Sequence, residues 1–435
     1  YSVRKQTATA ALLRLRRWAC CRAFCCWRTI LSPLSGSWPV LPPASSAASP
    51  ASASLAAAAA GSWLFSARPA RAAGQQHVLY FYEELAPDAR EQLDHQLSGV
   101  DLHLLHQLTN NTHAAPDWAA MARRATPPPA VRLEDREAAF ISAAAARRAG
   151  EEVLRAGRAA AILVAGGQGT RLGFDHPKGM FPLGPVSGHA LFQILIEKVV
   201  ATARRYNASV PLYVMTSPAT HEETVAYLTA HDRFGLPADD LRVFCQGTMP
   251  AVDAATGKLI RAAKDSLALA PDGHGGMLEA MNRSGVQEHA RERGISLFCY
   301  GQVDNPLLQF CHPELIGYHV LAESEMTTQV VRKATPLERV GNVVMVDGKM
   351  HIIEYSDLPE DVALQRNPDD TLHIWAGSIA VHVFDAAFLW RISYRADVLP
   401  FHRAHKQVAY VDAQGAQHTP TAPNAFKFER FIFDL

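Results

Sequence analysis

The chain has 435 residues, which is too many for one small core, so we expect two or three structural units. Hydrophobic residues make up 48% of it and charged residues 19%, a balance typical of globular proteins. The 42 basic and 42 acidic side chains give a formal net charge of zero, so no global charge signal favours a nucleic-acid partner. No apolar stretch reaches the roughly 18–20 residues of a membrane-spanning helix, and we expect no membrane partner.

The first 75 residues differ in composition from the rest. Residues 1–82 contain nine Lys and Arg and no Asp or Glu, which leaves 33 basic and 42 acidic side chains in the remaining chain, a net charge of −9. The Arg-rich, Ser-rich, acid-free composition is typical of an organellar transit peptide. A poorly ordered extension, or sequence translated from outside the gene start, fits equally well. We predict residues 1–75 to be a disordered or transit-like leader, and the protein to be cytoplasmic unless a true transit peptide sends it to a plastid or mitochondrion.

A helical N-terminal region is predicted over residues 76–157. Leu, Phe and Tyr recur at helical spacing from residue 76, and Pro87 suits a first helical turn. Three consecutive prolines at 127–129 interrupt the pattern, and residues 134–157 are expected to be helical again.

An alternating α/β pattern begins near residue 159. Short β-like runs alternate with amphipathic stretches, one of them a helix expected over 277–293, and this pattern predicts a parallel sheet with helices on both faces. Ligands bind such sheets at the carboxyl ends of the strands. After residue 325 hairpin signals dominate, such as Asp347-Gly348 between two strand-like runs. We assign residues 158–400 to this catalytic domain and 401–435 to the start of a further, truncated C-terminal region.

The stretch "ILVAGGQGTRLGFDHPKG" at 162–179 is the main candidate for phosphate binding. It does not match the dinucleotide motif, because Leu172 stands in place of the third glycine, nor the P-loop, because Gly179 follows Lys178. Bare backbone N–H groups can approach phosphate oxygens closely. Arg171 can bind a triphosphate tail with two donors, and Lys178 suits a phosphoryl group that gains charge. An ordinary tight turn with two surface cations is the alternative.

Two later loops carry further candidates. "LAPDGHGG" at 269–276 places Gly273 in a second glycine-rich turn, where bare backbone can meet the edge of a flat ring. "YGQVDN" places Asp304 directly after an apolar strand, and a hard divalent cation such as Mg²⁺ is a natural partner for that carboxylate. A plain loop and a strand-end cap are the simpler interpretations.

Together these motifs resemble a known family. G-G-x-G-T-R-L-G-x-x-x-P-K-G resembles the signature of nucleotidyltransferases that act on uridine nucleotides, and "AGGQGTRLG" is most similar to the UDP-N-acetylhexosamine pyrophosphorylases of the UDPGP type 1 family. The resemblance runs from about residue 76 to the end, through "YVMTS", "APDGHGG", "VDN", "VGNVV", "EYSD" and "KFERFIFD". It implies an α/β, Rossmann-like (GT-A-like) nucleotidyltransferase fold with a mixed, mainly parallel sheet.

The resemblance also implies roles for individual residues. Arg171 and Lys178 would be catalytic, and Asp304 would hold the Mg²⁺ cofactor. The residues expected to contact UTP are Val164, Ala165, Gly166, Gly167, Lys178, Gln246, Gly273, Asp304 and Lys427. The residues expected to contact the sugar are His274, Gly341, Glu354, Tyr355, Trp375 and Ser378. Among the latter, His274, Trp375 and Ser378 stand where relatives carry asparagine, which leaves the choice of sugar open.

The implied activity joins UTP to N-acetylglucosamine 1-phosphate and releases pyrophosphate. UTP and an N-acetylhexosamine 1-phosphate are then the partners, and we expect a monomer although the oligomeric state is open. One alternative is a broad-specificity UDP-sugar pyrophosphorylase. Another is a uridine-nucleotide-binding module that is inactive because its C-terminal part is missing, since the family pattern continues past the position of Leu435 with more helix, a small β-rich domain and another substrate-binding lysine.

Overall fold

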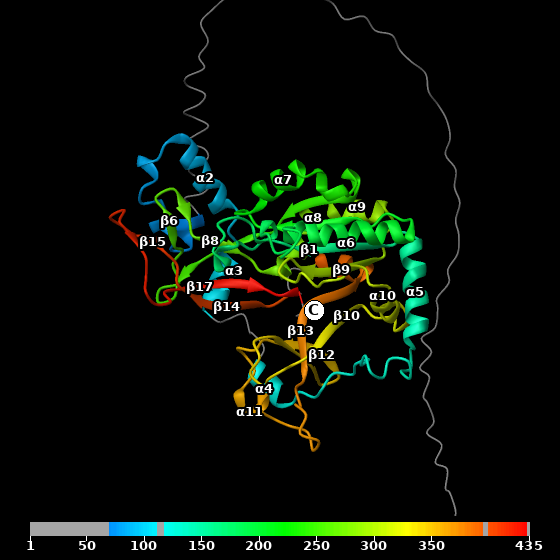
Figure 1. The fold of residues 1–435 in the computed structure, drawn as a ribbon. Coiled ribbons are helices and arrows are strands. Elements are labelled where there is room, and N and C mark those ends of the chain that lie inside the picture. Colours follow the sequence, from blue (N-terminus) through cyan, green and yellow to red (C-terminus); the bar gives the residue numbers. More distant parts are fainter. Residues whose placement is uncertain (1–68, 111–116, 395–398, 433–435) are drawn as a thin grey trace, which may run out of the picture. The chain divides into compact units, whose positions relative to one another are not determined.

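The computed structural model describes residues 69–110, 117–394 and 399–432 (Figure 1). The cysteines at positions 20–26 and most of the leader lie outside these ranges. Within them, Cys299 and Cys311 are buried and Cys245 is half-buried, and all three are free thiols. None of the helices in these ranges has the length and apolar character needed to cross a membrane.

A mixed sheet forms the centre of the fold, with strand order β12-β11-β13-β9-β1-β2-β3. One half is parallel and comprises β9 (Leu297–Gln302), β1 (Ala159–Val164), β2 (Leu212–Thr216) and β3 (Leu241–Cys245). The other half is antiparallel and comprises β13 (Ala376–Asp385), β11 (Gly341–Val346), β12 (Lys349–Ile353) and β10 (Met326–Arg332), which pairs with β13. The predicted α/β class with a mixed sheet is confirmed.

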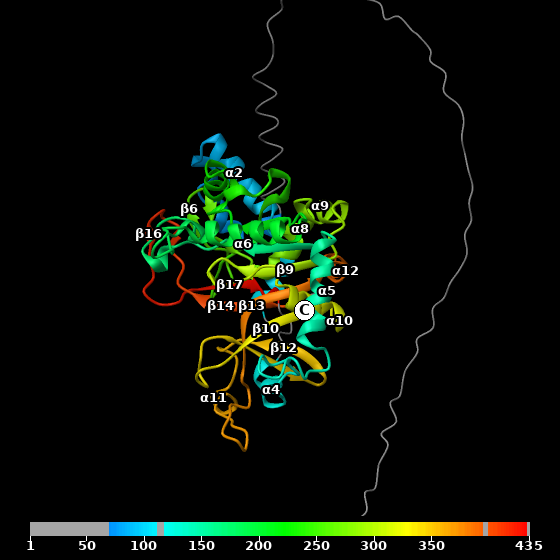
Figure 2. The same cartoon turned by 45° about the vertical axis from the view of Figure 1, so that its right-hand side comes forward.

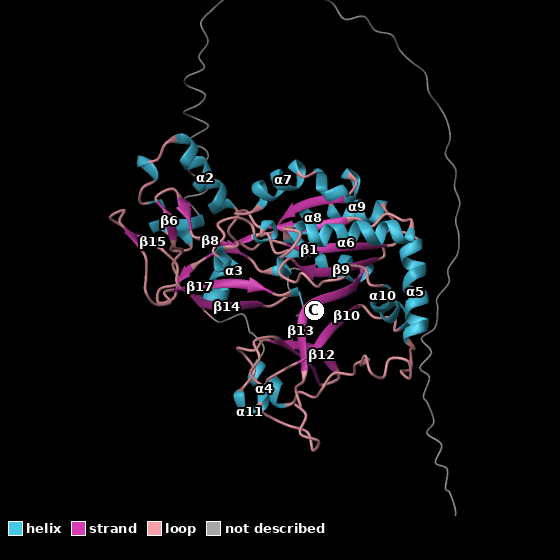
Figure 3. Cartoon of the chain, viewed as in Figure 1, coloured by secondary structure: helices cyan, strands magenta, loops and turns pink. Residues whose placement is uncertain are grey.

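Helices cover both faces of this sheet (Figure 3). One core contains side chains of α5 (Ala143–Arg155), α6 (Leu191–Tyr206), α7 (His221–Ala230) and α10 (Pro313–Leu321). The other contains side chains of α8 (Met277–Arg283), α9 (Val286–Glu292) and α12 (Ala386–Ser393). Strand β1 supplies both cores, since Ala161 and Leu163 belong to the first and Ala160 and Ile162 to the second. An all-apolar strand is what such a doubly covered position requires.

The N-terminal elements pack in two separate places. The segment starts with two short 3₁₀ turns, η1 (Gln76–Leu79) and η2 (Tyr82–Glu84), and continues with α2 (Pro87–Ser98), α3 (Leu102–Thr109) and α4 (Trp118–Arg123). Pro87 begins α2, as predicted. Helices α2 and α3 share a core with Val252 and Phe428, whereas α4 packs beside the β11–β12 hairpin and α11 (Glu360–Ala363) (Figure 2).

Several small sheets surround the central one. The largest joins β14 (Phe401–Lys406), β17 (Ala425–Arg430) and β5 (Val252–Asp253). Three two-stranded sheets pair β4 (Thr248–Pro250) with β8 (Leu269–Pro271), β6 (Arg261–Ala263) with β7 (Ser266–Leu267), and β15 (Tyr410–Val411) with β16 (Gln417–His418). The β5–β17 pairing brings residues 425–426 against 252–253. The domain boundaries predicted from the sequence stay predictions, although Gln75 already donates to the Gly257 carbonyl and accepts from the Leu259 N–H.

Two of the predicted helices differ from the structure. The helix expected over 134–157 begins only at Ala143, because the Ser142 hydroxyl accepts the N–H of Ala145 and caps it there. The single helix expected over 277–293 is two helices, because Gly285 has a φ of +72°. The Asp347-Gly348 turn is confirmed, with positive φ at both residues, as a two-residue hairpin of this kind requires.

Helices α5 and α10 approach each other closely at two glycines. A Cβ added at Gly150 would lie 1.8 Å from the Pro313 carbonyl oxygen, and one at Gly317 would lie 1.6 Å from the Ala146 oxygen. Neither position can accept a methyl group unless the helices separate.

We therefore expect Gly317→Ala to destabilise the protein by about 1–3 kcal/mol or more, because overpacking forces backbone shifts. Gly99→Ala is the matched control, since its added Cβ would meet nothing closer than 3.6 Å. Urea unfolding of both variants measures the difference. Equal midpoints would show that the two helices tolerate separation.

Candidate functional site

The glycine-rich loop after β1 closes on itself. The N–H of Ala165 donates to the Met215 carbonyl at 2.7 Å and holds the start of the loop on the sheet. At the other end, the N–H of Lys178 donates to the Gly167 carbonyl at 3.0 Å. Gly169 lies against Phe174, where an added Cβ would come within 2.8 Å of the ring. The closed loop therefore places Lys178 beside the bare backbone of Gly167.

Lys178 also meets Asp304. Its Nζ lies 3.2 Å from Oδ2 of Asp304, and a Cβ on Gly167 would be 3.7 Å from the same nitrogen. The sheet explains this meeting: β1 and β9 are parallel, with Val164 opposite Gln302, so the residues that follow leave the sheet at the same edge. The Lys178 side chain is 24% exposed and that of Asp304 52%, so a ligand can reach both.

Arg171 and Lys427 are placed differently. Arg171 lies in the exposed turn η3 (Thr170–Leu172) and Lys427 lies on β17. Within the described ranges neither side chain has a hydrogen-bond or ion-pair partner, and the structure does not join either one to the Lys178–Asp304 pair. Each cation keeps its donors available for an anionic ligand.

Gln246 and Gly273 are brought together by the β4–β8 pairing. Gln246 follows β3, and its buried side chain puts Oε1 3.1 Å from the position of a Cβ on Gly166. The next residue, Gly247, accepts the N–H of Asp272 at 3.2 Å. The amide of Gln246 thus lies beside the glycine loop, and the residue after it is hydrogen-bonded to the second glycine turn. An amide can both donate and accept, which suits the edge of a flat polar ring.

The second glycine turn is held by strand β17. Gly273 has a φ of +84°, and an added Cβ would lie 2.3 Å from the Arg430 carbonyl oxygen, so only glycine fits. The Arg430 N–H donates to the Asp272 carbonyl at 2.8 Å, and its guanidinium donates to the Asp272 carboxylate at 2.6 Å. Burial raises the pKa of Asp272, and the charge of Arg430 opposes that rise.

Three of the predicted sugar residues meet at the start of β13. Gly341 pairs with Ser378, and a Cβ on Gly341 would lie 3.3 Å from Glu354 Oε1 and 3.7 Å from Ser378 Cβ. Because β13 runs antiparallel to β9, with His382 opposite Tyr300, its first residues extend past the carboxyl end of β9. This small cluster therefore lies at the same edge of the sheet as Asp304.

Of the other three, Trp375 and His274 are partly occupied by contacts within the protein, whereas Tyr355 is exposed. The Arg132 guanidinium carbon lies 4.9 Å from the Trp375 ring centroid, so one ring face is already covered. Tyr355 is 49% exposed. The Nδ1 atom of His274 accepts the Ile432 N–H at 3.2 Å, and the ring stacks on Phe431.

The charge state of His274 follows from its surroundings. Burial, with a smaller effect of His402, lowers its pKa to about 4. The ring is therefore neutral near pH 7, and with Nδ1 accepting from Ile432 its donor is Nε2–H.

Sequence reasoning missed the residues that support these loops. Lys198 on α6 donates to the carbonyls of Pro306 at 2.5 Å and Leu308 at 3.0 Å, and so fixes the segment after Asp304. The Ser217 hydroxyl donates to the Gly166 carbonyl at 2.8 Å. For Lys198, the one signal in the sequence was a lysine within the mainly apolar first part of α6. The Asp272–Arg430 pair joins residues 158 apart, so the local sequence carried no sign of it.

A metal ion would have to share its ligands with a substrate. No group of three or more His, Cys, Asp or Glu residues that could hold a metal occurs in the part of the chain that the structure describes. Asp304 nevertheless fits Mg²⁺, because this ion is commonly held by one or two carboxylates together with substrate phosphates. Its Oδ2 contacts Lys178, and its side chain is half-exposed at the strand end.

His274 should make stability depend on pH. Its folded pKa of about 4 lies below the ordinary 6.5, so the unfolded chain binds the proton first as pH falls, and stability is lost between about pH 6.5 and 4. His274→Asn removes this proton site and keeps an acceptor for the Ile432 N–H. We expect the wild type to lose about 1–2 kcal/mol more than the variant between pH 7 and pH 5. Urea unfolding at both pH values tests this, and equal losses would contradict it.

Comparisons with known proteins show which family the chain resembles. The profile of the family described as UTP–glucose-1-phosphate uridylyltransferase matches residues 104–379. The mouse protein UDP-N-acetylhexosamine pyrophosphorylase-like protein 1 is 35% identical over 379 residues, which cover 83% of this chain and 74% of the mouse protein. The UDP-N-acetylglucosamine pyrophosphorylase of Saccharomyces cerevisiae is 36% identical over 293 residues, which cover 66% of this chain and 61% of the yeast protein.

A solved structure shows the same fold. The uridine diphosphate N-acetylglucosamine pyrophosphorylase of Trypanosoma brucei superposes with a TM-score of 0.73 at 25% identity, over 86% of this chain and 74% of the trypanosome chain. The extent of the family match and the identity to the mouse relative establish the assignment. This chain belongs to the UTP–glucose-1-phosphate uridylyltransferase family.

Proposed function

We propose that this protein is a uridylyltransferase that joins UTP to N-acetylglucosamine 1-phosphate, giving UDP-N-acetylglucosamine and pyrophosphate. The observation that carries this proposal is the meeting of the Lys178 ammonium, the bare backbone of Gly167 and the Asp304 carboxylate at the carboxyl edge of the sheet. Two relatives, 36% and 25% identical to this chain, are named UDP-N-acetylglucosamine pyrophosphorylase.

The chemistry needs positioning more than proton transfer. A phosphate oxygen of the sugar phosphate attacks the α-phosphorus of UTP in line, and a new O–P bond forms. The bond from the α-phosphorus to the bridging oxygen breaks, and its electron pair leaves with pyrophosphate. Because the nucleophile is already an anion, no general base is required. Catalysis then comes from holding the reactants in line and from neutralising charge.

Each cation has a distinct part in this proposal. Lys178 lies nearest the glycine loop and stabilises the charge that develops at the α-phosphorus. Arg171 and Lys427, which have no partner in the described part of the chain, hold the leaving pyrophosphate. The segment Val164–Gly167 lies against the nucleotide, and Gln246 with Gly273 selects uracil through amide and backbone hydrogen bonds. Where Mg²⁺ binds, Asp304 holds it, and the ion supplies charge neutralisation at the phosphates.

The sugar end is proposed from the cluster at the start of β13. A Cβ on Gly341 would lie 2.8 Å from Ile352 Cγ2 and 3.3 Å from Glu354 Oε1, so a side chain would be crowded there, and the bare backbone of Gly341 would line the pocket for the N-acetyl arm. Glu354 and Tyr355 would bind hexose hydroxyls. His274 offers only Nε2–H, and Trp375 offers one ring face and one N–H donor, so both would discriminate between hydroxyls less strictly than asparagine amides, which donate and accept.

Pyrophosphate release and UTP binding, measured on the same sample, test the proposed function. Release that requires both UTP and N-acetylglucosamine 1-phosphate supports it. UTP binding without release would mean that this chain is a binding module. If the sample neither binds UTP nor releases pyrophosphate, that result contradicts the uridine assignment itself.

Lys178→Ala should lower kcat by roughly 10²–10³-fold and change the affinity for UTP much less, because its charge acts mainly in the transition state. Lys349→Ala, on the exposed β11–β12 hairpin, is the matched lysine control. Steady-state pyrophosphate release measures both variants. An unchanged kcat would remove Lys178 from the mechanism.

Asp304→Asn should raise the Mg²⁺ concentration needed for half-maximal rate, because a neutral amide is a poorer ligand for a hard cation. Asp88→Asn, in the first turn of α2, controls for loss of a surface charge. The measurement is a Mg²⁺ titration of the initial rate. If the half-maximal concentration is the same in both variants and the wild type, the ion is held by other groups.

The sugar cluster predicts relaxed selectivity between two N-acetylhexosamines. Apolar contact discriminates by only about 1–3 kcal/mol, whereas hydrogen bonds to hydroxyls discriminate sharply. We expect both N-acetylglucosamine and N-acetylgalactosamine 1-phosphates to be used, and glucose 1-phosphate to be the poorer substrate. Comparing kcat/KM for the three decides this. A preference for glucose 1-phosphate would favour a broad UDP-sugar pyrophosphorylase instead.

A further inference from the structure

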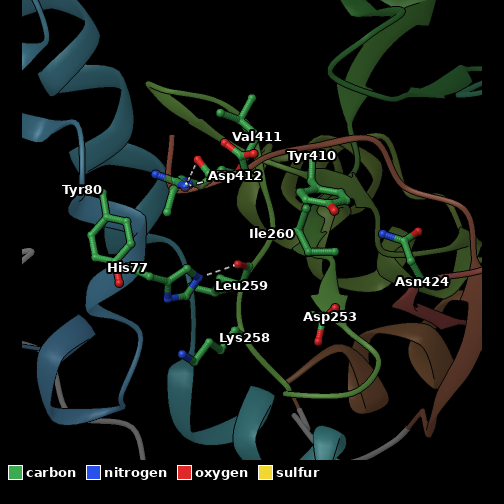
Figure 4. Close-up of a pocket in the computed structure, with 12 residues that line it drawn as sticks. His77, Tyr80, Asp253, Lys258, Leu259, Ile260, Tyr410, Val411, Asp412 and Asn424 are labelled. Carbon is green, nitrogen blue, oxygen red and sulfur yellow. Dashed lines mark hydrogen bonds between the residues drawn. The ribbon is translucent and has the colours of Figure 1, made fainter. Parts of the chain in front are cut away.

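A hollow lies away from the residues considered so far. Its volume is about 280 Å³, and its walls come from η1, the turn between β5 and β6, strand β15 and Asn424 (Figure 4). None of these residues belongs to the predicted UTP or sugar sites. The volume is just below the 300–1,000 Å³ typical of ligand pockets, so an occupant would be small.

The hollow gathers basic groups without acidic partners. Lys258 is exposed, and its side chain has no hydrogen-bond or ion-pair partner within the described ranges. Arg261 is only 4% exposed, yet its Nε and Nη1 have no acceptor there, while Nη2 donates to the carbonyls of Val411 and Asp412. Burial lowers the pKa of His77, and the charges of Lys258 and Arg261 lower it further. The charges of Lys258 and Arg261 therefore both act on the His77 imidazole.

The two acidic residues of the hollow are already satisfied by their own turns. Oδ1 of Asp253 accepts the N–H groups of Ala255 and Thr256 and the Thr256 hydroxyl. The Asp412 carboxylate accepts two backbone N–H groups and the Nε2–H of His418. Neither carboxylate forms an ion pair with Lys258 or Arg261 among the described contacts. The donors left without an acceptor therefore belong to cations, although the two carboxylates keep their negative charge, and an anionic group would accept from those donors.

Two aromatic rings add a second requirement. Tyr80 and Tyr410 lie on opposite sides of the hollow, with Ile260 between them (Figure 4). The outer part of Tyr80 is available, since this residue is 57% exposed. Each ring already has one contact within the protein, since the Arg261 guanidinium carbon lies 5.5 Å from the Tyr80 ring centroid and the His418 ring stacks on Tyr410 at 4.9 Å. The remaining ring surface, with the aliphatic side chain of Ile260, favours a flat apolar group over a bare ion.

We propose that this hollow binds a small organic anion made of one flat ring and one phosphate or carboxylate group. The anionic group lies against Lys258 and Arg261, and the ring lies between Tyr80 and Tyr410. This site is independent of uridylyl transfer.

Phenyl phosphate is the probe, with inorganic phosphate and phenol as its two halves. Calorimetric titration of the whole chain should show that phenyl phosphate binds more tightly than either half. Lys258→Ala should weaken binding about tenfold, because a charged hydrogen bond is lost. Tyr80→Ala should weaken it about three- to tenfold through loss of ring contact. Lys264→Ala, a lysine on the neighbouring β6–β7 turn that pairs with Glu84, is the control and should not weaken it.

The glycine loop is the competing site for a phosphate ester. Lys178→Ala should bind phenyl phosphate as the wild type does. Loss of binding in Lys178→Ala, with Lys258→Ala unaffected, would overturn the proposal and place the probe at the glycine loop. Equal affinity for inorganic phosphate and phenyl phosphate would overturn the proposal that a ring lies between Tyr80 and Tyr410. Absence of phenyl phosphate binding at millimolar concentrations would overturn the site as a whole. None of these results depends on pyrophosphate release, so they leave the proposed activity to its own assay.

Discussion

The parallel pairing of β1 with β2 on one side and β9 on the other is the constraint on which the candidate site depends. Val164 lies opposite Met215 and Gln302, so all three strands end level with one another. Strand β1, which lies between β2 and β9, is buried on both faces, and its register cannot slip without exposing apolar side chains. The glycine loop and Asp304 must therefore leave the sheet at the same edge, which is why Lys178 can meet both.

The second glycine turn depends on a contact between distant parts of the chain. Residues 425–430 run along the second glycine turn, where the Arg430 backbone fills the space that a side chain on Gly273 would need. The Arg430–Asp272 ion pair, with both side chains largely buried, then fixes the turn from two directions. Removal of one partner from a buried pair leaves an uncompensated charge, so this contact holds the turn more firmly than a surface pair would. The second glycine turn thus takes this conformation only when β17 is in place.

The charges at the glycine loop and those in the hollow beside η1 are arranged differently. At the glycine loop, Lys178 is paired with Asp304 while Arg171 and Lys427 are unpaired in the described part of the chain, which suits a ligand that carries several phosphates and a cation. In the hollow beside η1, the carboxylates are satisfied by their own turns and the cations are not. That arrangement suits a single anionic group.

The sequence by itself determined the elements whose physics is local. Strand and helix periodicity predicted the α/β alternation, Pro87 predicted a helix start, and Asp347-Gly348 predicted a hairpin, because each depends on φ and ψ preferences of a few neighbours. Tertiary structure alone decided the gathering of Gly341, Glu354 and Ser378. It also placed Arg132 on Trp375 and Arg430 on Asp272. These contacts depend on strand register and on segments far apart in the chain, and local propensity carries no information about either.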